Sequence, residues 1–561
     1  MKRRPFFSFL AAIVLVLLSA SAVGAVWLTA KSPLRLAQVR VVESPDASIF
    51  VSRQAPLMLS LQVNPDRLKT FNLAKTPLTE RGQIQAQFDR WQRDLLGDVR
   101  LSYADDIAPW AGDEITVALM NADVDRNETN GRQPGYLLAV KIADPAQATA
   151  SIQRFWRQQP IGRTELTSEP YAGVKLVYTK SPDQAAASVT TAIVSDQFVL
   201  FANYPKVLRE ALNNIQVPEL SLGEDEAYQK AVNQLPDRRI GIAFLNVPQF
   251  ASLLRSETQE GDRPKAQSLI AALQLAPAGI LADTTLLVSE EQPIDRHQPA
   301  LTKPVAALKS IPAVSSLVAA GTDLDAFWQQ VIQGSEQGLL LNTQLQAFVQ
   351  TLQTQWGIDI ATDLFPWMRG EFALGLVPRS DRPQPDWIFV TERSTATDAE
   401  VAHLNAIADE RGMSNGSFKL GEQEIFAWTK LMPIAAANRS AMHPLSLEAT
   451  VQGLRTRLGN YEIFATSIEA MSQALNAVQN SILDQPNFQQ AIELLPPQNN
   501  GYVYADWSTL KNQLNLLQPI ERLEQTLKPF FADLQAITLT SDSSDGTRYH
   551  AKALMRFREE A

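Results

Sequence analysis

Residues 106–114 read Asp-Ile-Ala-Pro-Trp-Ala-Gly-Asp-Glu, and residues 363–371 repeat the pattern as Asp-Leu-Phe-Pro-Trp-Met-Arg-Gly-Glu. Aspartate, proline, tryptophan and glutamate coincide without a gap at a shift of 257 residues. At the same shift, an apolar stripe with the i, i+4, i+7, i+11 spacing of one helix face precedes each copy. The two stripes are Ile84, Phe88, Trp91, Leu95 and Leu341, Leu345, Phe348, Leu352.

Further matches follow these segments in the same order along the chain. Phe201-Ala202 corresponds to Phe464-Ala465 at a shift of 263, and Leu235-Pro236 corresponds to Leu495-Pro496 at a shift of 260. The shift drifts only slightly, as insertions in loops would produce. An ordered series of this kind indicates an internal duplication. We predict two homologous modules, at residues 48–300 and 301–561.

Each module alternates short apolar runs of strand type with helical patterns. In the first, strands are expected at 114–120, 136–142, 174–179, 192–202 and 240–245, and helices at 144–158, 205–215 and 226–235. Short connections between neighbouring strands favour antiparallel pairing, and helices inserted among antiparallel strands are typical of the α+β class. The predicted fold is therefore α+β, with two modules of mainly antiparallel sheet and packed helices.

The N-terminus carries a separate signal. Lys2, Arg3 and Arg4 are followed by 26 uncharged residues, 5–30, with a dense apolar centre. Such a segment is long enough to span a bilayer, which takes about 20 apolar residues. We predict a retained transmembrane anchor at 1–30 and a linker at 31–47; the alternative is a signal peptide cleaved near Ala20-Ser21-Ala22. Both place most of the chain on the periplasmic or thylakoid-lumen side of a membrane.

Composition excludes several functions. The 561 residues are 45% apolar, enough for large cores, and carry a net charge of −10, which argues against nucleic-acid binding. The chain has no cysteine, so thiol nucleophiles, disulfides and cysteine-ligated metals are excluded. Neither a P-loop nor a G-x-G-x-x-G motif is present. We therefore predict no cofactor and expect a protein that is not an enzyme.

The repeated acids are the candidate catalytic residues. Asp106 and Glu114, and their counterparts Asp363 and Glu371, each place two carboxylates beside a tryptophan, which suits acid–base chemistry or sugar stacking. In the structural alternative, proline ends a helix, tryptophan fills a helix–strand corner and the acids cap or solvate it. The duplication favours this alternative, because a packing corner is needed in both modules and an active site usually once.

Metal sites have weaker candidates. Asp123, Asp125 and Asn127 place oxygen donors at alternate positions of a polar loop, as in a calcium site. An EF-hand also needs glycine at loop position 6 and glutamate at position 12, where this chain has Glu128 and Pro134, so a hairpin loop is the alternative. The four histidines, His297, His403, His443 and His550, are too scattered to seed a zinc motif.

The length, the N-terminal apolar segment, the paired D-x-x-P-W-x-x-x-E segments and the glutamine-rich composition together resemble an uncharacterised family. Its members are exported or membrane-anchored cyanobacterial proteins, and a domain of unknown function covers nearly the whole chain. The resemblance implies a cell-envelope or thylakoid setting and supplies no catalytic residues.

Three functional hypotheses follow. The first is a membrane-anchored, non-enzymatic interaction or scaffold protein that binds a protein partner. The second is a carrier or sensor of a hydrophobic ligand, a lipid or pigment, held between sheet and helices by aromatic side chains such as Trp156. The third is an envelope hydrolase that uses the paired carboxylates.

Overall fold

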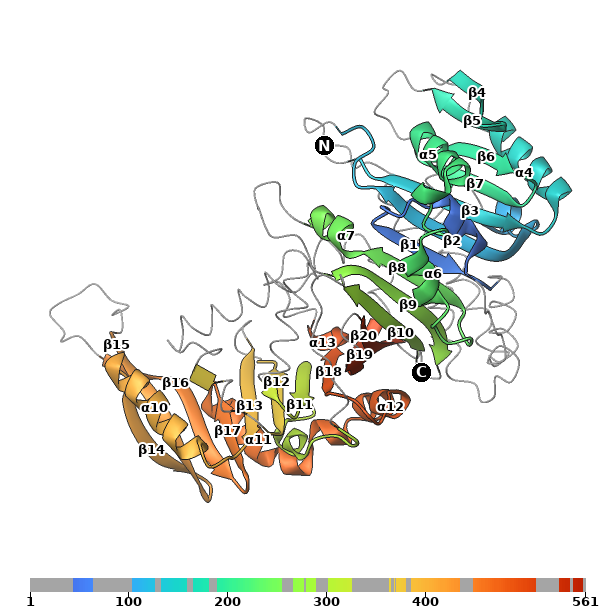
Figure 1. The fold of residues 1–561 in the computed structure, drawn as a ribbon. Coiled ribbons are helices and arrows are strands. Elements are labelled where there is room, and N and C mark those ends of the chain that lie inside the picture. The colour runs from blue at the N-terminus through green and yellow to red at the C-terminus, as the bar shows by residue number, and fades with distance from the viewer. Residues whose placement is uncertain are drawn as a thin grey trace. The chain divides into compact units, whose positions relative to one another are not determined.

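The structure is a computed structural model, and the residues that it describes are 44–63, 103–126, 133–158, 165–180, 189–254, 266–276, 279–288, 301–324, 363–364, 368, 370–379, 385–433, 447–510, 534–544 and 548–557. Contacts divide the chain into two compact units. Unit 1 comprises residues 1–295, 519–535 and 545–561, and unit 2 comprises residues 296–518 and 536–544. Figure 1 shows the elements of both units.

Unit 1 is built on one antiparallel sheet with helices on both faces. The strand order is β4-β5-β6-β7-β3-β2-β1-β8-β9-β10-β20. The elements are η3 (Asp46–Phe50), β1 (Leu57–Leu61), η5 (Tyr103–Ile107), β2 (Ala111–Asn121), β3 (Gly135–Ile142), α4 (Pro145–Gln158), β4 (Glu165–Tyr171), β5 (Val174–Lys180), β6 (Thr190–Val194), β7 (Phe198–Ala202), α5 (Pro205–Gln216), η7 (Pro218–Leu220), α6 (Glu226–Val232), β8 (Gly241–Asn246), α7 (Val247–Leu254), β9 (Ala266–Ala276), β10 (Gly279–Val288) and β20 (Arg548–Phe557).

Unit 2 repeats this order as β14-β15-β16-β17-β13-β12-β11-β18-β19, again antiparallel throughout. The elements are η8 (Ala306–Ser310), β11 (Leu317–Gly321), β12 (Phe372–Val377), β13 (Asp386–Glu392), α10 (Thr397–Glu410), β14 (Ser414–Leu420), β15 (Gln423–Pro433), β16 (Leu447–Leu458), β17 (Tyr461–Ala465), α11 (Ile468–Asn476), η11 (Ala477–Gln479), η12 (Ile482–Asp484), α12 (Pro486–Leu494), β18 (Tyr502–Asp506), α13 (Trp507–Leu510) and β19 (Leu534–Ser544). The predicted α+β class with mainly antiparallel sheet is confirmed.

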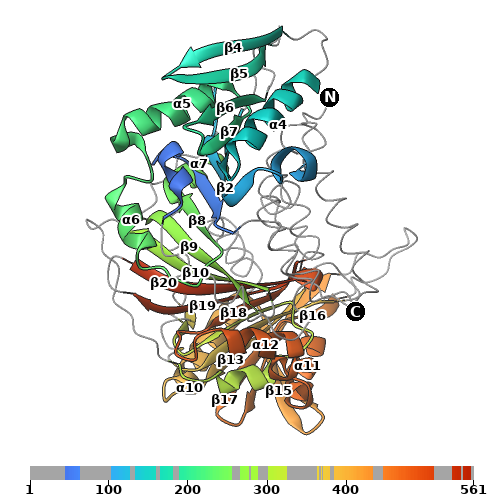
Figure 2. The same cartoon turned by 90° about the vertical axis from the view of Figure 1, so that its right-hand side faces the viewer.

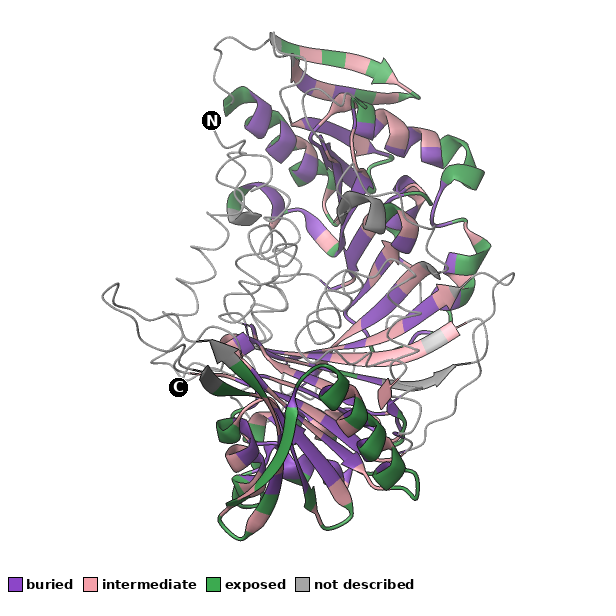
Figure 3. Ribbon diagram, turned by 90° about the vertical axis from the view of Figure 1, so that its left-hand side faces the viewer, coloured by how far each residue is buried: buried purple, intermediate pink, exposed green. Residues whose placement is uncertain are grey.

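The two faces of the unit 1 sheet carry separate apolar cores. One core packs α4 against inward side chains such as Val117 and Leu138, and the other packs η3, α5 and α6 against Met58 and Leu137. Because successive strand residues point to opposite faces, strands buried on both sides read as nearly continuous apolar runs. Figure 3 shows these central strands coloured as buried. In unit 2, α10 covers one face, and η8, α11 and α12 cover the other.

Two turns of the type favoured in tight hairpins explain where the sequence-based assignment differs from the structure. The predicted strand 192–202 is a hairpin, β6–β7, because Ser195 and Asp196 both adopt positive φ, at 51° and 54°. Ala172 and Gly173, at 52° and 76°, similarly turn β4 into β5, and β4 was not predicted. Positive φ at both central residues matches the right-handed twist of the strands.

The ends of the modules also differ from the predicted limits. The helix η3 begins at Asp46, inside the predicted linker 31–47. The last strand, β20, which was predicted to be part of module 301–561, pairs with β10 and is therefore part of unit 1 (Figure 2). Asp283 of β10 and Lys552 of β20 form an ion pair of 3.0 Å within this ladder.

The predicted anchor, 1–30, lies outside the described residues. Among the residues that are described, no helix combines the length and the apolar character needed to cross a membrane. Membrane anchoring and export therefore stay predictions from the sequence.

Candidate functional site

Glu114, one of the repeated acids, lies on β2 with only 5% of its surface exposed. Its carboxylate accepts hydrogen bonds from the backbone amides of Asp46 (3.0 Å) and Ala47 (2.8 Å), the first two residues of η3. The first amides of a helix have no partner within the helix, so an acceptor at this place completes it. No side chain caps η3 from within its own segment. Glu114 therefore caps η3 from the neighbouring sheet.

Burial disfavours the ionised form of the Glu114 carboxyl. Desolvation raises its pKa from 4.5 to about 7, against the opposing effect of the two backbone hydrogen bonds. Asp46 raises this pKa slightly further, and Lys141 lowers it. Lys141 in turn binds the carboxylate of Asp46 at 2.7 Å, a hydrogen bond that holds the pKa of Lys141 above its ordinary value. The carboxyl of Glu114 thus titrates close to neutral pH at a helix terminus.

Glu371 has the same position in unit 2. It accepts hydrogen bonds from the amides of Ala306 (2.7 Å) and Ala307 (3.3 Å), which begin η8. The hydroxyl of Tyr461 donates a third hydrogen bond, at 2.7 Å. Burial, followed by this bond to a carboxylate, raises the pKa of Tyr461. The repeated glutamate therefore serves the same capping contact in both units, which corresponds to the structural alternative for this motif.

Trp110 is completely buried at the corner between η5 and β2. Its indole Nε1 donates a hydrogen bond to the backbone carbonyl of Asp106, and its ring belongs to the apolar core beneath α4. Asp106 itself is 9% exposed, and Asp363 is half-buried in unit 2. Pro366 and Trp367, the counterparts of the first copy's proline and tryptophan, lie outside the described residues. In unit 1 the tryptophan fills a helix–strand corner.

The calcium candidates lie at the β2–β3 turn. Asp123 accepts a hydrogen bond from the backbone amide of Gln133 at 3.1 Å, which helps to close the turn. Asp125 is exposed, and Asn127 lies outside the described residues. No group of three or more metal-ligating side chains occurs in the described part of the chain.

Two of the four histidines can be placed. His403 is exposed on α10, and His550 on β20 lies 3.3 Å from the hydroxyl of Thr285. His297 and His443 lie outside the described residues.

A cluster of charges in unit 2 was missed by the sequence analysis. Glu462 on β17 is fully buried and binds Arg393 and Arg455, the latter at 2.8 Å. Asp398 accepts hydrogen bonds from Arg393 and Arg457, each at 2.8 Å. The bond from Arg393 holds the pKa of Asp398 below its ordinary value. Arg393 follows directly after β13, whereas Arg455 and Arg457 lie on β16, so no local spacing indicated that the three arginines meet.

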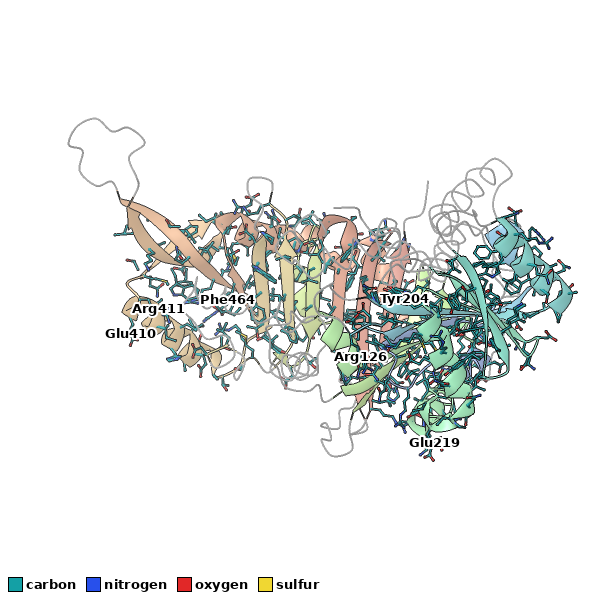
Figure 4. All side chains as sticks on the ribbon, turned by 90° about the horizontal axis from the view of Figure 1, so that it is seen from above. Arg126, Tyr204, Glu219, Glu410, Arg411 and Phe464 are labelled. Atoms are coloured by element: carbon teal, nitrogen blue, oxygen red, sulfur yellow. The ribbon has the colours of Figure 1, made fainter. Side chains whose placement is uncertain are left out.

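An apolar hollow lies beneath α10 in unit 2. It is small, with a cavity volume of about 30 Å³. Its lining includes Ala408 and Met413 at the end of α10, and Trp428, Gly453 and Phe464 on the sheet. Figure 4 labels Phe464 on β17 and, at the end of α10, Glu410 and Arg411. A groove between sheet and helices was predicted for a hydrophobic ligand, but none of the residues that line this hollow was named for it.

One short motif could suggest a hydrolase. Residues 412–416 read Gly-Met-Ser-Asn-Gly, which matches the G-x-S-x-G letters of a nucleophile elbow. In an elbow the serine lies at a sharp turn from a strand into a helix. Here the order is reversed, because α10 ends at Glu410 and β14 begins at Ser414, which is exposed. The context does not support a nucleophile.

Residues 10–557 match the family described as protein of unknown function, DUF3352. The chain belongs to this family. The predicted domain of unknown function over most of the chain is thereby confirmed, whereas the cyanobacterial origin stays a prediction.

Other comparisons of this DUF3352 chain are distant. No curated protein matches it. Crystal form I of TP0453 is 11% identical, with 45% of this chain and 81% of that chain covered and a TM-score of 0.24. Crystal form IV of TP0453 is 12% identical, with 44% and 82% covered and a TM-score of 0.22. Similarity at this level carries no functional argument for the DUF3352 chain.

Proposed function

We propose that this chain is a non-enzymatic interaction or scaffold protein, anchored in a membrane by residues 1–30 and exposed on the extracytoplasmic side. The observation that carries the proposal is an apolar corner that occurs at the same place in both units. Large exposed apolar side chains on a folded surface, when they gather, are typical of docking sites.

The corner in unit 1 follows α5. Ile215, Val217 and Leu220 are 37%, 43% and 44% exposed, and the carbonyl of Leu220 accepts a hydrogen bond from the amide of Arg53. In unit 2 the corresponding bond joins the amide of Ala313 to the carbonyl of Asn480.

Val314 and Val478 flank the bond in unit 2 and are 56% and 64% exposed. Exposed apolar side chains beside the corresponding backbone bond in both units suit a protein that holds a partner at two places.

The repeated glutamates add support. Glu114 and Glu371 contact the amides of η3 and η8, a use that needs no substrate. The hydrolase alternative rested on these carboxylates, so the contacts favour a binding role over it.

Co-purification of the full chain in mild detergent tests the proposal. We expect a stoichiometric protein partner, which Val478→Asp and Leu220→Asp release. Leu166→Asp is the matched control, since Leu166 is 54% exposed on β4 and is part of neither corner. A solitary monomer, or a partner retained by both corner variants, would contradict the proposal.

The membrane part of the proposal needs its own experiment. Alkaline carbonate should leave the full chain in the membrane fraction, whereas a chain shortened to begin near residue 31 should be released. Protection of the full chain from protease added to the extracytoplasmic side would refute the proposed orientation.

A further inference from the structure

Strand β14 forms one edge of the unit 2 sheet (Figure 1). It pairs with β15 over its whole length, and within the described part of the chain no other strand pairs with it. Its first four residues, Ser-Asn-Gly-Ser, are exposed, and so is Lys419. An edge strand carries a row of backbone amides and carbonyls that can pair with another chain. The edge of unit 2 is therefore a candidate contact surface.

The corresponding edge of unit 1 is blocked. Strands β4 and β14 both have seven residues, and each follows the helix of 14 residues in its unit, α4 or α10. In β4, Pro170 has no amide hydrogen to donate, and Glu169 adds a charge. Proline and charged side chains are the means by which proteins prevent pairing at sheet edges. Strand β14 has no proline and a single charged residue, Lys419.

The sequence of β14 is complementary to itself. Ser417 is its central residue, so a two-fold axis at Ser417 would pair all seven residues with those of a second copy in antiparallel orientation. The facing pairs would be Ser417 with Ser417, Gly416 with Phe418, Asn415 with Lys419 and Ser414 with Leu420.

Each of the central pairs is favourable. A Cβ at Gly416 would have no atom within 4 Å, so there is room for a ring beside it. Phe418 is only partly buried against the core of unit 2, and an aromatic ring that covers a glycine on a neighbouring strand stabilises a sheet. The ammonium of Lys419 would face the neutral amide of Asn415, so no like charges would meet.

We propose that two copies of this chain associate through β14, antiparallel about Ser417, so that their unit 2 sheets become continuous. Backbone hydrogen bonds supply the affinity of such an added strand, and the facing side chains set its register. The contact is independent of the proposed function, because no residue of the apolar corners lies on β14. Failure of one proposal would leave the other in place.

Cross-linking tests the register. Because the chain has no cysteine, a single introduced cysteine can form a disulfide only with the same residue of a second copy. Ser417→Cys should give a disulfide-linked dimer of the full chain in mild detergent, since facing Cα atoms about 4.5–5.5 Å apart are within disulfide reach. Ser414→Cys is the matched control, because it is exposed on the same strand and its two copies would be about 20 Å apart.

We expect the Ser417→Cys chain to cross-link at least about tenfold faster than the Ser414→Cys chain. Equal rates would mean random collision and would overturn the proposed register.

Sedimentation of the full chain in mild detergent tests the association itself. Ser417→Asp would place two carboxylates opposite each other and should raise the dimer Kd about threefold or more, whereas Asn415→Asp would face Lys419 and should lower it by a similar factor. Ser414→Asp, which would face Leu420, should leave the Kd unchanged. A wild type that stays monomeric up to about 100 µM, or a shift in the same direction for the first two variants, would overturn the proposal.

Discussion

Replacing Glu114 with glutamine should change how the stability of unit 1 depends on pH. The carboxyl of Glu114 is buried against η3, and desolvation raises its pKa from 4.5 to about 7 in the folded chain. The folded state therefore favours the protonated form. Stability from this group is greatest below pH 4.5, falls as the pH rises from 4.5 to about 7, and is constant above that. Glutamine has a similar shape and does not titrate in this range.

The magnitude follows from the shift. Each pKa unit corresponds to about 1.4 kcal/mol, so the full change from pH 4.5 to above 7 is up to about 3 kcal/mol. The wild type should lose this much stability relative to Glu114→Gln across that range. Lys141 also faces Glu114, which helps to raise the pKa of Lys141 above 10.5, so Lys141 stays charged throughout this pH range in both proteins.

The assay is urea unfolding of the full chain in mild detergent at a series of pH values. Hydrogen–deuterium exchange of peptides from β2 reports on unit 1 separately from unit 2. A difference between wild type and Glu114→Gln that stays constant within about 0.5 kcal/mol, well below the roughly 3 kcal/mol that linkage gives, would refute the reasoning. It would mean that the two amides of η3 offset the desolvation of the carboxylate completely.

Three further predictions concern stability and can be measured by denaturant unfolding with the same peptide-resolved exchange. Trp110→Ala empties a completely buried corner and should destabilise unit 1 by about 3–5 kcal/mol, whereas a cost below about 1 kcal/mol would contradict its role in the core. Glu462→Ala leaves buried arginines without their carboxylate and should cost unit 2 about 3–5 kcal/mol. Arg457→Ala, at a side chain that is 53% exposed, should cost less than about 1 kcal/mol, and equal costs for these two variants would argue against the burial effect. Gly279→Ala should expose the β20 amides to exchange, because φ is +150° and its Cβ would meet the carbonyl oxygen of Met555 at 1.9 Å; wild-type protection would contradict this.

Local patterns were sufficient for much of the fold. The helix expected at 144–158 is confirmed as α4, because a proline at the first turn and an apolar face at helical spacing are local signals. The strand expected at 114–120 lies within β2. Strand β4, with the sequence Glu-Leu-Thr-Ser-Glu-Pro-Tyr, was missed because a polar edge strand lacks the apolar alternation of a half-buried one.

The sequence indicated some residues of the candidate site but not their contacts. The repeat singled out Glu114 and Glu371, but their partners lie 68 and 65 residues earlier in the chain. A glutamate that acts in catalysis and a glutamate that caps a helix are the same residue type in a sequence, and only their structural surroundings distinguish them. The arginines around Glu462 and the hollow under Ala408 had no sequence signal at all, because each depends on which strands lie side by side.

The sequence by itself determined the duplication, the α+β class and the charged, apolar N-terminus, because repeats, hydrophobic periodicity and charge can be recognised from the order of the residues without knowing which residues are in contact. The tertiary structure decided which contacts the repeated residues make. It placed Glu114 and Glu371 at helix termini, joined β20 to β10, and brought Arg393 and Arg455 to the buried carboxylate of Glu462. Long-range contacts set burial and hydrogen-bond partners, and these set the chemistry of a side chain.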